Sequence, residues 1–220
     1  MRVRVLSRQA VEDGGAEGVD AVISIRASAN GDFNQLDTAV AQALAGEVDA
    51  ALVLRFDDIA LPAYGPFVGP DMEHLAQTLD FARALRDQSP DAVLAVHCEH
   101  GVSRSAAVAL AIITDEMGPG REDEAVAKLL RSDIDARMHP NPLIVSLADT
   151  ALWRYGALDA ALAAVSPSYV HWRDHWREVA LDPERHWETA RRMRFRRRSS
   201  RPAAVRGECL HPHRSLDEDE

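Results

Sequence analysis

Residues 92–105 read AVLAVHCEHGVSRS, and the elements around this segment can be predicted outward from it. Ala92–Val96 is a short apolar run rich in valine, which predicts a buried strand. Ala106–Met117 is strongly apolar and is followed by Gly-Pro-Gly, which predicts a helix that stops there. The polar residues from His97 to Ser105 therefore form a loop that leaves a buried strand and enters a helix.

Strand-like and helix-like segments alternate along the chain on both sides of this loop. Short apolar runs predict strands, and apolar residues at helical spacing predict helices. The other expected strands are Val3–Leu6, Val19–Ile25 and Ala50–Phe56, and the other expected helices are Asp37–Ala45, Asp71–Gln88, Glu122–Leu130 and one from Pro140 to near Tyr155. The alternation predicts an α/β fold with a central, mostly parallel sheet of about four to five strands flanked by helices, plus a C-terminal helical extension.

The loop has the residue types of an anion site. Backbone N–H groups at a helix N-terminus bind anions, and Gly101 allows the tight turn that lets several of them converge. Arg104 offers a planar, two-pronged donor to phosphate oxygens, and a thiolate at Cys98 is a competent nucleophile in such a positive environment. Ser105 can donate a hydrogen bond to that sulfur, and His97 is expected to order the loop from the strand side. The amides expected to surround a phosphate are those of Glu99, His100, Gly101, Val102, Ser103 and Arg104.

These residues resemble a known family. Cys98–Arg104 matches the C-x5-R signature of protein tyrosine phosphatases, and Gly101–Ser105 is similar to the Gly-x-Ser-Arg-Ser ending of the dual-specificity branch. Leu130–Asn141 resembles the segment that follows in that branch, and Leu52–Asp58 resembles compact bacterial members. The resemblance covers Val19–Leu158. It implies the cysteine phosphatase fold and a tyrosine or dual-specificity phosphomonoesterase that works through a cysteinyl-phosphate, without metal or cofactor.

The resemblance also implies an aspartic acid that protonates the departing oxygen. In the family this residue follows the strand that precedes the cysteine-bearing strand, which here is Ala50–Phe56. That strand runs into Asp57 and Asp58, and comparison with the compact members places Asp58 on the acid position. Adjacent residues of an extended chain point in opposite directions, so only one of the pair should reach the site. Asp57 is the alternative, and Asp71 is a more distant one.

The expected substrate is a phosphorylated protein or peptide. Glu99 lies where phosphoinositide phosphatases typically carry lysines, which argues against a polyphosphorylated lipid headgroup. Ile59–Pro70 is a longer loop than in the smallest family members, and its Tyr64 and Phe67 either line the pocket entrance or fix the loop to the domain. The sequence leaves phosphotyrosine against phosphoserine or phosphothreonine open. The alternative function is a catalytically weak phosphate-reading module, a pseudophosphatase.

We expect three parts in the chain: a phosphatase domain at 1–160, a helical extension at 161–198 and a disordered tail at 199–220. Ser166-Pro167 predicts a helix start, and one apolar stripe follows at helical spacing. The stripe consists of Tyr169, Trp172, Trp176 and Val179. We expect it to dock on the phosphatase domain, with a homodimer or a partner protein as the alternative.

Composition and charge restrict the remaining classes. The net charge is -10, its acidic excess lies before residue 161, and an acidic domain disfavours nucleic acid. The sequence has no run of about 18 apolar residues, so no membrane span is expected. Cys98 and Cys209 are the only cysteines, and the N-terminus reads unlike a signal peptide. Together these features predict free thiols and a cytoplasmic protein.

Overall fold

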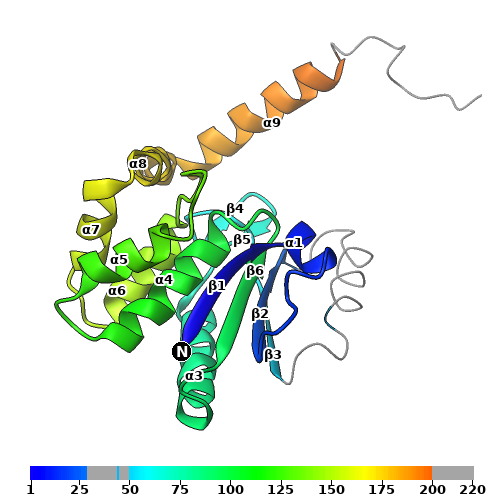
Figure 1. The fold of residues 1–220 in the computed structure, drawn as a ribbon. Helices are drawn as coiled ribbons and strands as arrows, with labels where there is room; N and C mark the ends of the chain where they lie inside the picture. The colour runs from blue at the N-terminus through cyan, green and yellow to red at the C-terminus, as the bar shows by residue number, and fades with distance from the viewer. Residues whose placement is uncertain (29–43, 45–49, 200–220) are drawn as a thin grey trace, which may run out of the picture. The chain divides into compact units, whose positions relative to one another are not determined.

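A computed structural model describes residues 1–28, 44 and 50–199, and side chains as far as residue 193 (Figure 1). Contacts divide the chain into two compact units, Met1–Pro183 and Glu184–Glu220. The boundary that we expected after residue 160 falls inside α7 (Ala157–Val165), so this helix and the one after it belong to the first unit. The expected helix Asp37–Ala45, apart from Leu44, lies outside the described residues, as do Cys209 and the expected tail beyond residue 199.

The first unit is built on a four-stranded sheet in the order β1-β6-β2-β3. Its strands are β1 (Arg2–Ser7), β2 (Ala21–Arg26), β3 (Ala50–Arg55) and β6 (Val93–Cys98). Every pairing between them is parallel, which confirms the predicted α/β fold. All six residues of the central strand β6 are buried, because helices cover the sheet on both faces.

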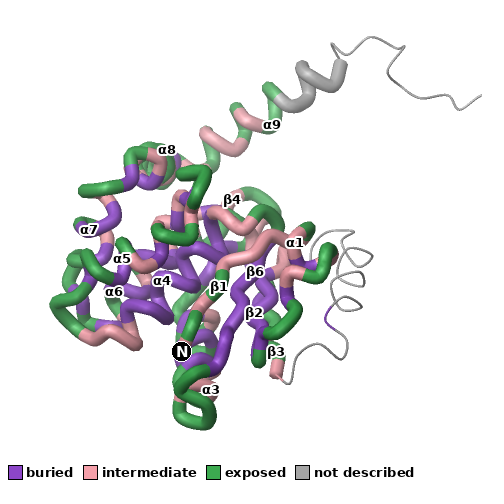
Figure 2. The backbone as a smooth tube through the Cα atoms, viewed as in Figure 1, coloured by how far each residue is buried: buried purple, intermediate pink, exposed green. Residues whose placement is uncertain are grey.

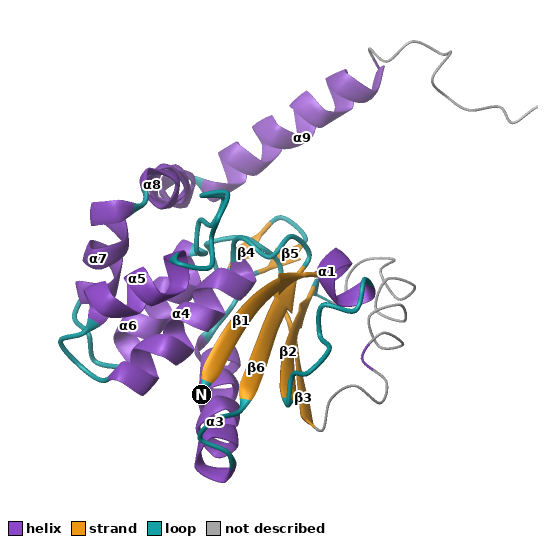
Figure 3. Ribbon diagram, viewed as in Figure 1, coloured by secondary structure: helices purple, strands orange, loops and turns teal. Residues whose placement is uncertain are grey.

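The two faces of the sheet carry separate apolar clusters, as alternating side chains require. Leu94, Val96 and Cys98 of β6 face the main core, whereas Val93 and Ala95 belong to a smaller cluster on the opposite side. Helices α4 (Arg104–Met117), α5 (Glu122–Leu130), α6 (Pro142–Ala151) and α7 lie on the main-core side, and the short helix α1 (Arg8–Glu12) lies on the other (Figure 3). Cys98 therefore lies at the carboxyl end of a strand that is buried along its whole length.

Helices supply the remaining layers. They are α3 (Met72–Gln88), α4 (Arg104–Met117), α5 (Glu122–Leu130), α6 (Pro142–Ala151) and α8 (Pro167–Leu181). Burial is concentrated in β2, β6 and α4 (Figure 2). Within α8, Tyr169 and Val179 are buried, and Tyr169 belongs to the main core. This helix therefore packs in cis on the same unit as the loop between β6 and α4.

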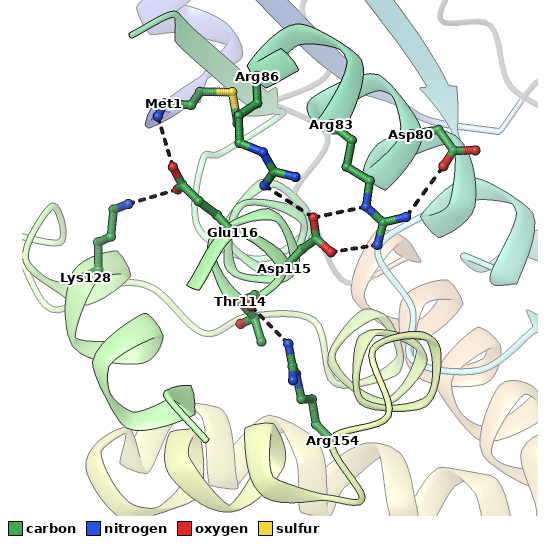
Figure 4. A network of polar contacts seen from close by, with 9 residues as sticks. All are labelled: Met1, Asp80, Arg83, Arg86, Thr114, Asp115, Glu116, Lys128 and Arg154. Atoms are coloured by element: carbon green, nitrogen blue, oxygen red, sulfur yellow. Dashed lines mark hydrogen bonds and ion pairs between the residues drawn. The ribbon is translucent and has the colours of Figure 1, made fainter. Parts of the chain in front are cut away.

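The far end of α4 is tied to its neighbours by ion pairs (Figure 4). Arg83 of α3 binds Asp115 through two nitrogens, at 2.6 and 3.1 Å. Glu116 accepts from the N-terminal ammonium at 3.0 Å and from Lys128 of α5 at 3.2 Å. Since Arg104 begins the same helix, these contacts fix the direction in which α4 presents its N-terminus.

One segment differs from the expectation. The loop after β3 contains a short antiparallel pair, β4 (Ala63–Tyr64) and β5 (Phe67–Val68), which the sequence analysis treated as irregular. The last described helix, α9 (Pro183–Ser199), is rich in arginine, lies almost wholly in the second unit and falls in the helical extension that we expected at 161–198. None of the helices in the described residues is long and apolar enough to cross a membrane.

Candidate active site

Cys98 is the last residue of β6 and is buried, with 3% of its surface exposed. Its sulfur lies 3.1 Å from the hydroxyl of Ser105, which is in the first turn of α4. The strand and the helix are joined by the short loop that the sequence predicted. Two residues seven positions apart are thereby brought into hydrogen-bond contact, at a distance usual for a weak bond to sulfur.

Gly101 shapes the loop, because it adopts a left-handed conformation with φ of +73°. A Cβ atom at this position would lie 2.8 Å from the backbone nitrogen of Ser7 and 2.9 Å from the carbonyl carbon of Leu6. A side chain there would therefore collide with backbone that cannot easily move. Glycine is needed both for the turn and for the close approach of the loop to the end of β1.

The loop and Arg104 present hydrogen-bond donors that the protein itself leaves free. Within the described residues, the backbone N–H groups from Glu99 to Arg104 make no hydrogen bond. The guanidinium of Arg104 is buried, and one terminal nitrogen donates to the carbonyl of Phe56 at 3.0 Å. Its Nε has no partner among the described residues. Buried donors without partners are costly, and an oxyanion is the group that would satisfy several at once.

The structure separates the two candidate acids after β3. Oδ1 of Asp58 accepts from the hydroxyl of Ser103 at 2.7 Å and from the side-chain amide of Asn141 at 2.9 Å. Asp57 instead accepts from the hydroxyl of Ser28 at 2.6 Å and from the backbone of Val68 at 2.9 Å. Asp58 therefore lies against the loop between β6 and α4, whereas Asp57 fastens β5 to the segment after β2.

Asp71, the third candidate acid, has a structural partner. Its carboxylate accepts from the backbone of His74 at 3.0 Å and caps the N-terminus of α3. Glu99 points toward α1, where it pairs with Arg8 at 3.4 Å. Neither carboxylate is brought to Cys98 by these contacts.

The segment before α6 clamps the loop, a role that sequence reasoning missed. The backbone N–H of His139 donates to the carbonyl of Val102 at 2.9 Å, and that of Asn141 donates to Ser103 at 3.3 Å. The side chain of Asn141 also caps α6 through bonds from Leu143 and Ile144. The contact between Asn141 and Asp58 joins residues 83 positions apart, so no local pattern could have indicated it.

His97 differs from the expectation that it orders the loop. It is buried, and neither ring nitrogen has a hydrogen-bond partner among the described residues. Burial, and then the positive charges of Arg26 and Arg104, lower its pKa to about 4, against an opposing effect of the Cys98 backbone. The ring is therefore neutral at pH 7 and adds no charge beside Cys98.

A cavity of about 210 Å³ adjoins the loop on the side of Asp58. It is lined by Asp58, Ser103, His139, Asn141, Pro142, Trp172 and Trp176. Tyr64 contacts Trp176 edge to face, with ring centres 5.6 Å apart, and so connects the loop after β3 to α8. The two tryptophans come from the segment that the sequence analysis placed outside the phosphatase domain.

Comparisons with known proteins concern the fold. Searches against family models and against curated proteins give no match. Among solved structures, human DUSP28 is 22% identical over 72% of this chain and 94% of its own, with a TM-score of 0.49. Tk-PTP in its active form is 18% identical over 70% and 93%, at 0.46, and PTPMT1 is 17% identical over 74% and 95%, at 0.41. At these identities the case for a function rests on the site residues themselves.

Proposed function

We propose that the chain is a cysteine-dependent phosphomonoesterase of the tyrosine or dual-specificity type, acting on a phosphorylated protein or peptide. One observation carries the proposal: a single loop holds buried Cys98 together with backbone amides and an Arg104 nitrogen that have no partner among the described residues. A phosphate dianion offers acceptors to all of these donors while its phosphorus lies within reach of the sulfur.

The proposed reaction has two steps. The thiolate of Cys98 attacks phosphorus, a P–S bond forms, and the P–O ester bond breaks while Asp58 gives its proton to the departing oxygen. A water molecule then attacks phosphorus, Asp58 takes a proton from that water, and the P–S bond breaks to release inorganic phosphate. Ser105, 3.1 Å from the sulfur, is placed to donate a hydrogen bond to the thiolate as it leaves.

Charge on the transferring phosphoryl group is neutralised by Arg104 and the loop amides, so the chemistry requires no metal ion. We therefore expect turnover to be unaffected by EDTA and inhibited by vanadate, which binds an anion nest as phosphate does. Loss of activity on chelation would point to a metal-dependent mechanism instead.

The decisive experiment compares two cysteine variants on an aryl phosphate. Cys98→Ser should abolish turnover while the protein keeps its melting temperature, because a serine hydroxyl is a far weaker nucleophile at neutral pH. Cys209→Ser is the matched control and should retain activity. If the natural protein binds phosphate but releases none from any phosphopeptide, the pseudophosphatase becomes the better account.

A further inference from the structure

The cavity beside Asp58 lies where the proposed mechanism needs room for the leaving group of the phosphoester. Asp58 can protonate the departing oxygen only if that oxygen lies next to the exposed part of the Asp58 carboxylate. Asp58 is exposed, and together with Ser103 of the catalytic loop it forms part of the cavity wall. The leaving group of the phosphoester must therefore occupy this cavity while its phosphate lies in the loop.

Aromatic side chains form much of the rest of the wall. The ring of Trp172 stacks on His139, with centres 5.7 Å apart and planes at 24°. Trp172 keeps 40% of its surface exposed, so part of its ring remains available to a ligand. Trp176 reaches the same cavity from the next turn of α8 and is held edge to face against Tyr64.

The volume suits a single ring. A cavity of about 150 Å³ is enough to hold benzene, and pockets for drug-sized ligands start near 300 Å³. At about 210 Å³, this cavity has room for one phenyl ring and its oxygen. Polar atoms are supplied by Asp58, Ser103 and Asn141, and flat apolar faces by the tryptophans, which matches a phenolic oxygen attached to a ring.

The tryptophans are held in place before any ligand binds. Tyr169 is buried, and its hydroxyl donates to Asp159 at 2.5 Å. Ser168 donates to the carbonyl of Met138 at 3.2 Å, directly beside His139, and Arg173 pairs with Asp159 at 3.0 Å. A wall fixed in this way loses little conformational entropy when a ring packs against it.

We propose that Trp172 and Trp176 of α8, with His139, form a leaving-group subsite that selects aryl over alkyl phosphomonoesters. Aromatic rings pack on the indole faces, whereas the short alkyl stem of phosphoserine leaves those faces in contact with water. Phosphotyrosyl substrates are accordingly preferred to phosphoseryl and phosphothreonyl ones. The inference rests on the proposed function, and it assigns specificity to a helix that follows the segment matching the phosphatase family.

The test measures kcat/KM on a phosphotyrosyl peptide and on the same peptide with phosphoserine. Trp172→Ala should lower the value for phosphotyrosine about tenfold and leave the value for phosphoserine within about twofold, since only the ring loses its stacking partner. Trp172→Phe keeps an aromatic face and should restore most of the loss. Trp153→Ala is the matched control, because Trp153 is 74% exposed and lines no part of this cavity.

The outcomes separate the two proposals. If the natural protein is active and Trp172→Ala lowers kcat/KM equally on both peptides, or on neither, the subsite is overturned while the proposed phosphatase function stands. An inactive natural protein would contradict the proposed function, and the subsite would then be judged by binding. In the full-length Cys98→Ser protein, phosphotyrosine should quench tryptophan fluorescence and inorganic phosphate should not. Equal quenching by both, or none by phosphotyrosine, would refute the subsite, as would an unchanged phosphotyrosine signal in the same protein carrying Trp172→Leu.

Discussion

Asp57 and Asp58 are neighbours in the sequence, yet their carboxylates have different partners. Asp57 accepts two hydrogen bonds from Ser28 and one from Val68, and it is partly buried. Asp58 is exposed and contacts Ser103 and Asn141. The first carboxylate holds backbone together, and the second faces the cavity where a leaving group would lie.

An asparagine variant of Asp58 should therefore lower kcat, and one of Asp57 should lower stability. Asp58→Asn should lower kcat about 10²–10⁴-fold on an ester with a poor leaving group, because the proton donor is lost. Its melting temperature should change little, since asparagine keeps the oxygen that accepts from Ser103. Asp57→Asn should keep kcat but lower the free energy of unfolding by about 1–3 kcal/mol, because bonds to its second oxygen are lost.

Steady-state rates and thermal melts on both variants check this assignment. The kcat loss of Asp58→Asn should shrink on a substrate whose leaving oxygen needs no proton. If Asp57→Asn carries the catalytic loss instead, the acid has been placed one residue too late. If both variants retain kcat, neither carboxylate serves as the acid.

His97 should make the fold sensitive to mild acid. Its pKa is about 4 in the folded state against 6.5 for a free histidine, so between these values the unfolded chain binds a proton that the folded chain does not. The contribution of neutral His97 to the free energy of unfolding is thus fully present above pH 6.5 and is lost as pH falls toward 4. The loss is on the order of 3 kcal/mol at most. His97→Gln should flatten this dependence in chemical unfolding measured from pH 7 to 4.5.

An exposed histidine gives the comparison. His171→Gln should leave the slope of unfolding free energy against pH as it is in the natural protein, because its ring lies at the surface. Equal slopes for the natural protein and His97→Gln would mean that another group causes the acid sensitivity.

Single residues differ in how far the sequence could predict them. The sequence indicated the contact between Cys98 and Ser105, because the two residues share one loop and one helix turn. It favoured Asp58 as the acid, with Asp57 and Asp71 as alternatives, but could not show which carboxylate contacts Ser103. The bond from Asn141 to Asp58 spans 83 positions, and only tertiary packing creates it.

At the scale of elements, the loop between β6 and α4 is fixed by β1. The register pairs Ser7 with Cys98 at the ends of the two strands, and Gly101 then packs against Leu6 and Ser7. The apolar runs predicted β2 and β6 well, because parallel strands buried on both faces have continuous apolar sequences. The β4–β5 pair was missed, since strands this short carry almost no periodicity.

Gly101→Ala should damage this junction more than left-handed strain alone would. Gly118, at the end of α4, also has a positive φ of +82°, but nothing lies within 4 Å of the Cβ it would gain. Gly118→Ala should therefore cost about 1–3 kcal/mol of unfolding free energy, because the backbone there is in a region that L side chains rarely adopt, and should leave phosphate affinity intact. Gly101→Ala should cost more and also abolish phosphate binding, measured by calorimetry. Equal costs with equal phosphate affinity would show that the approach to β1 has no bearing on the nest.

At the scale of the whole molecule, the unit that holds Cys98 extends beyond residue 160. The resemblance to phosphatases stops near Leu158, which suggested a boundary at 160. The structure instead places Tyr169 in the main core and lines the cavity with side chains of α8. The sequence could not place this boundary, because an amphipathic helix has the same apolar pattern whether it packs in cis, on a second copy or on a partner protein.

Truncation should distinguish these arrangements. Ending the chain after Pro183 removes the second unit and should leave the melting temperature of the first unit unchanged, because Met1–Pro183 is a compact unit by itself. Ending it after Val165 removes Tyr169 and Val179 from the core and should lower stability sharply. In the full chain, Tyr169→Ala should reproduce much of that loss, by about 3–5 kcal/mol, as for other large buried aromatics. Thermal melts measure stability, and light scattering measures the oligomeric state. If the protein that ends after Val165 kept its melting temperature and changed from a dimer to a monomer, α8 would serve assembly. The cavity wall would then have to come from another part of the chain.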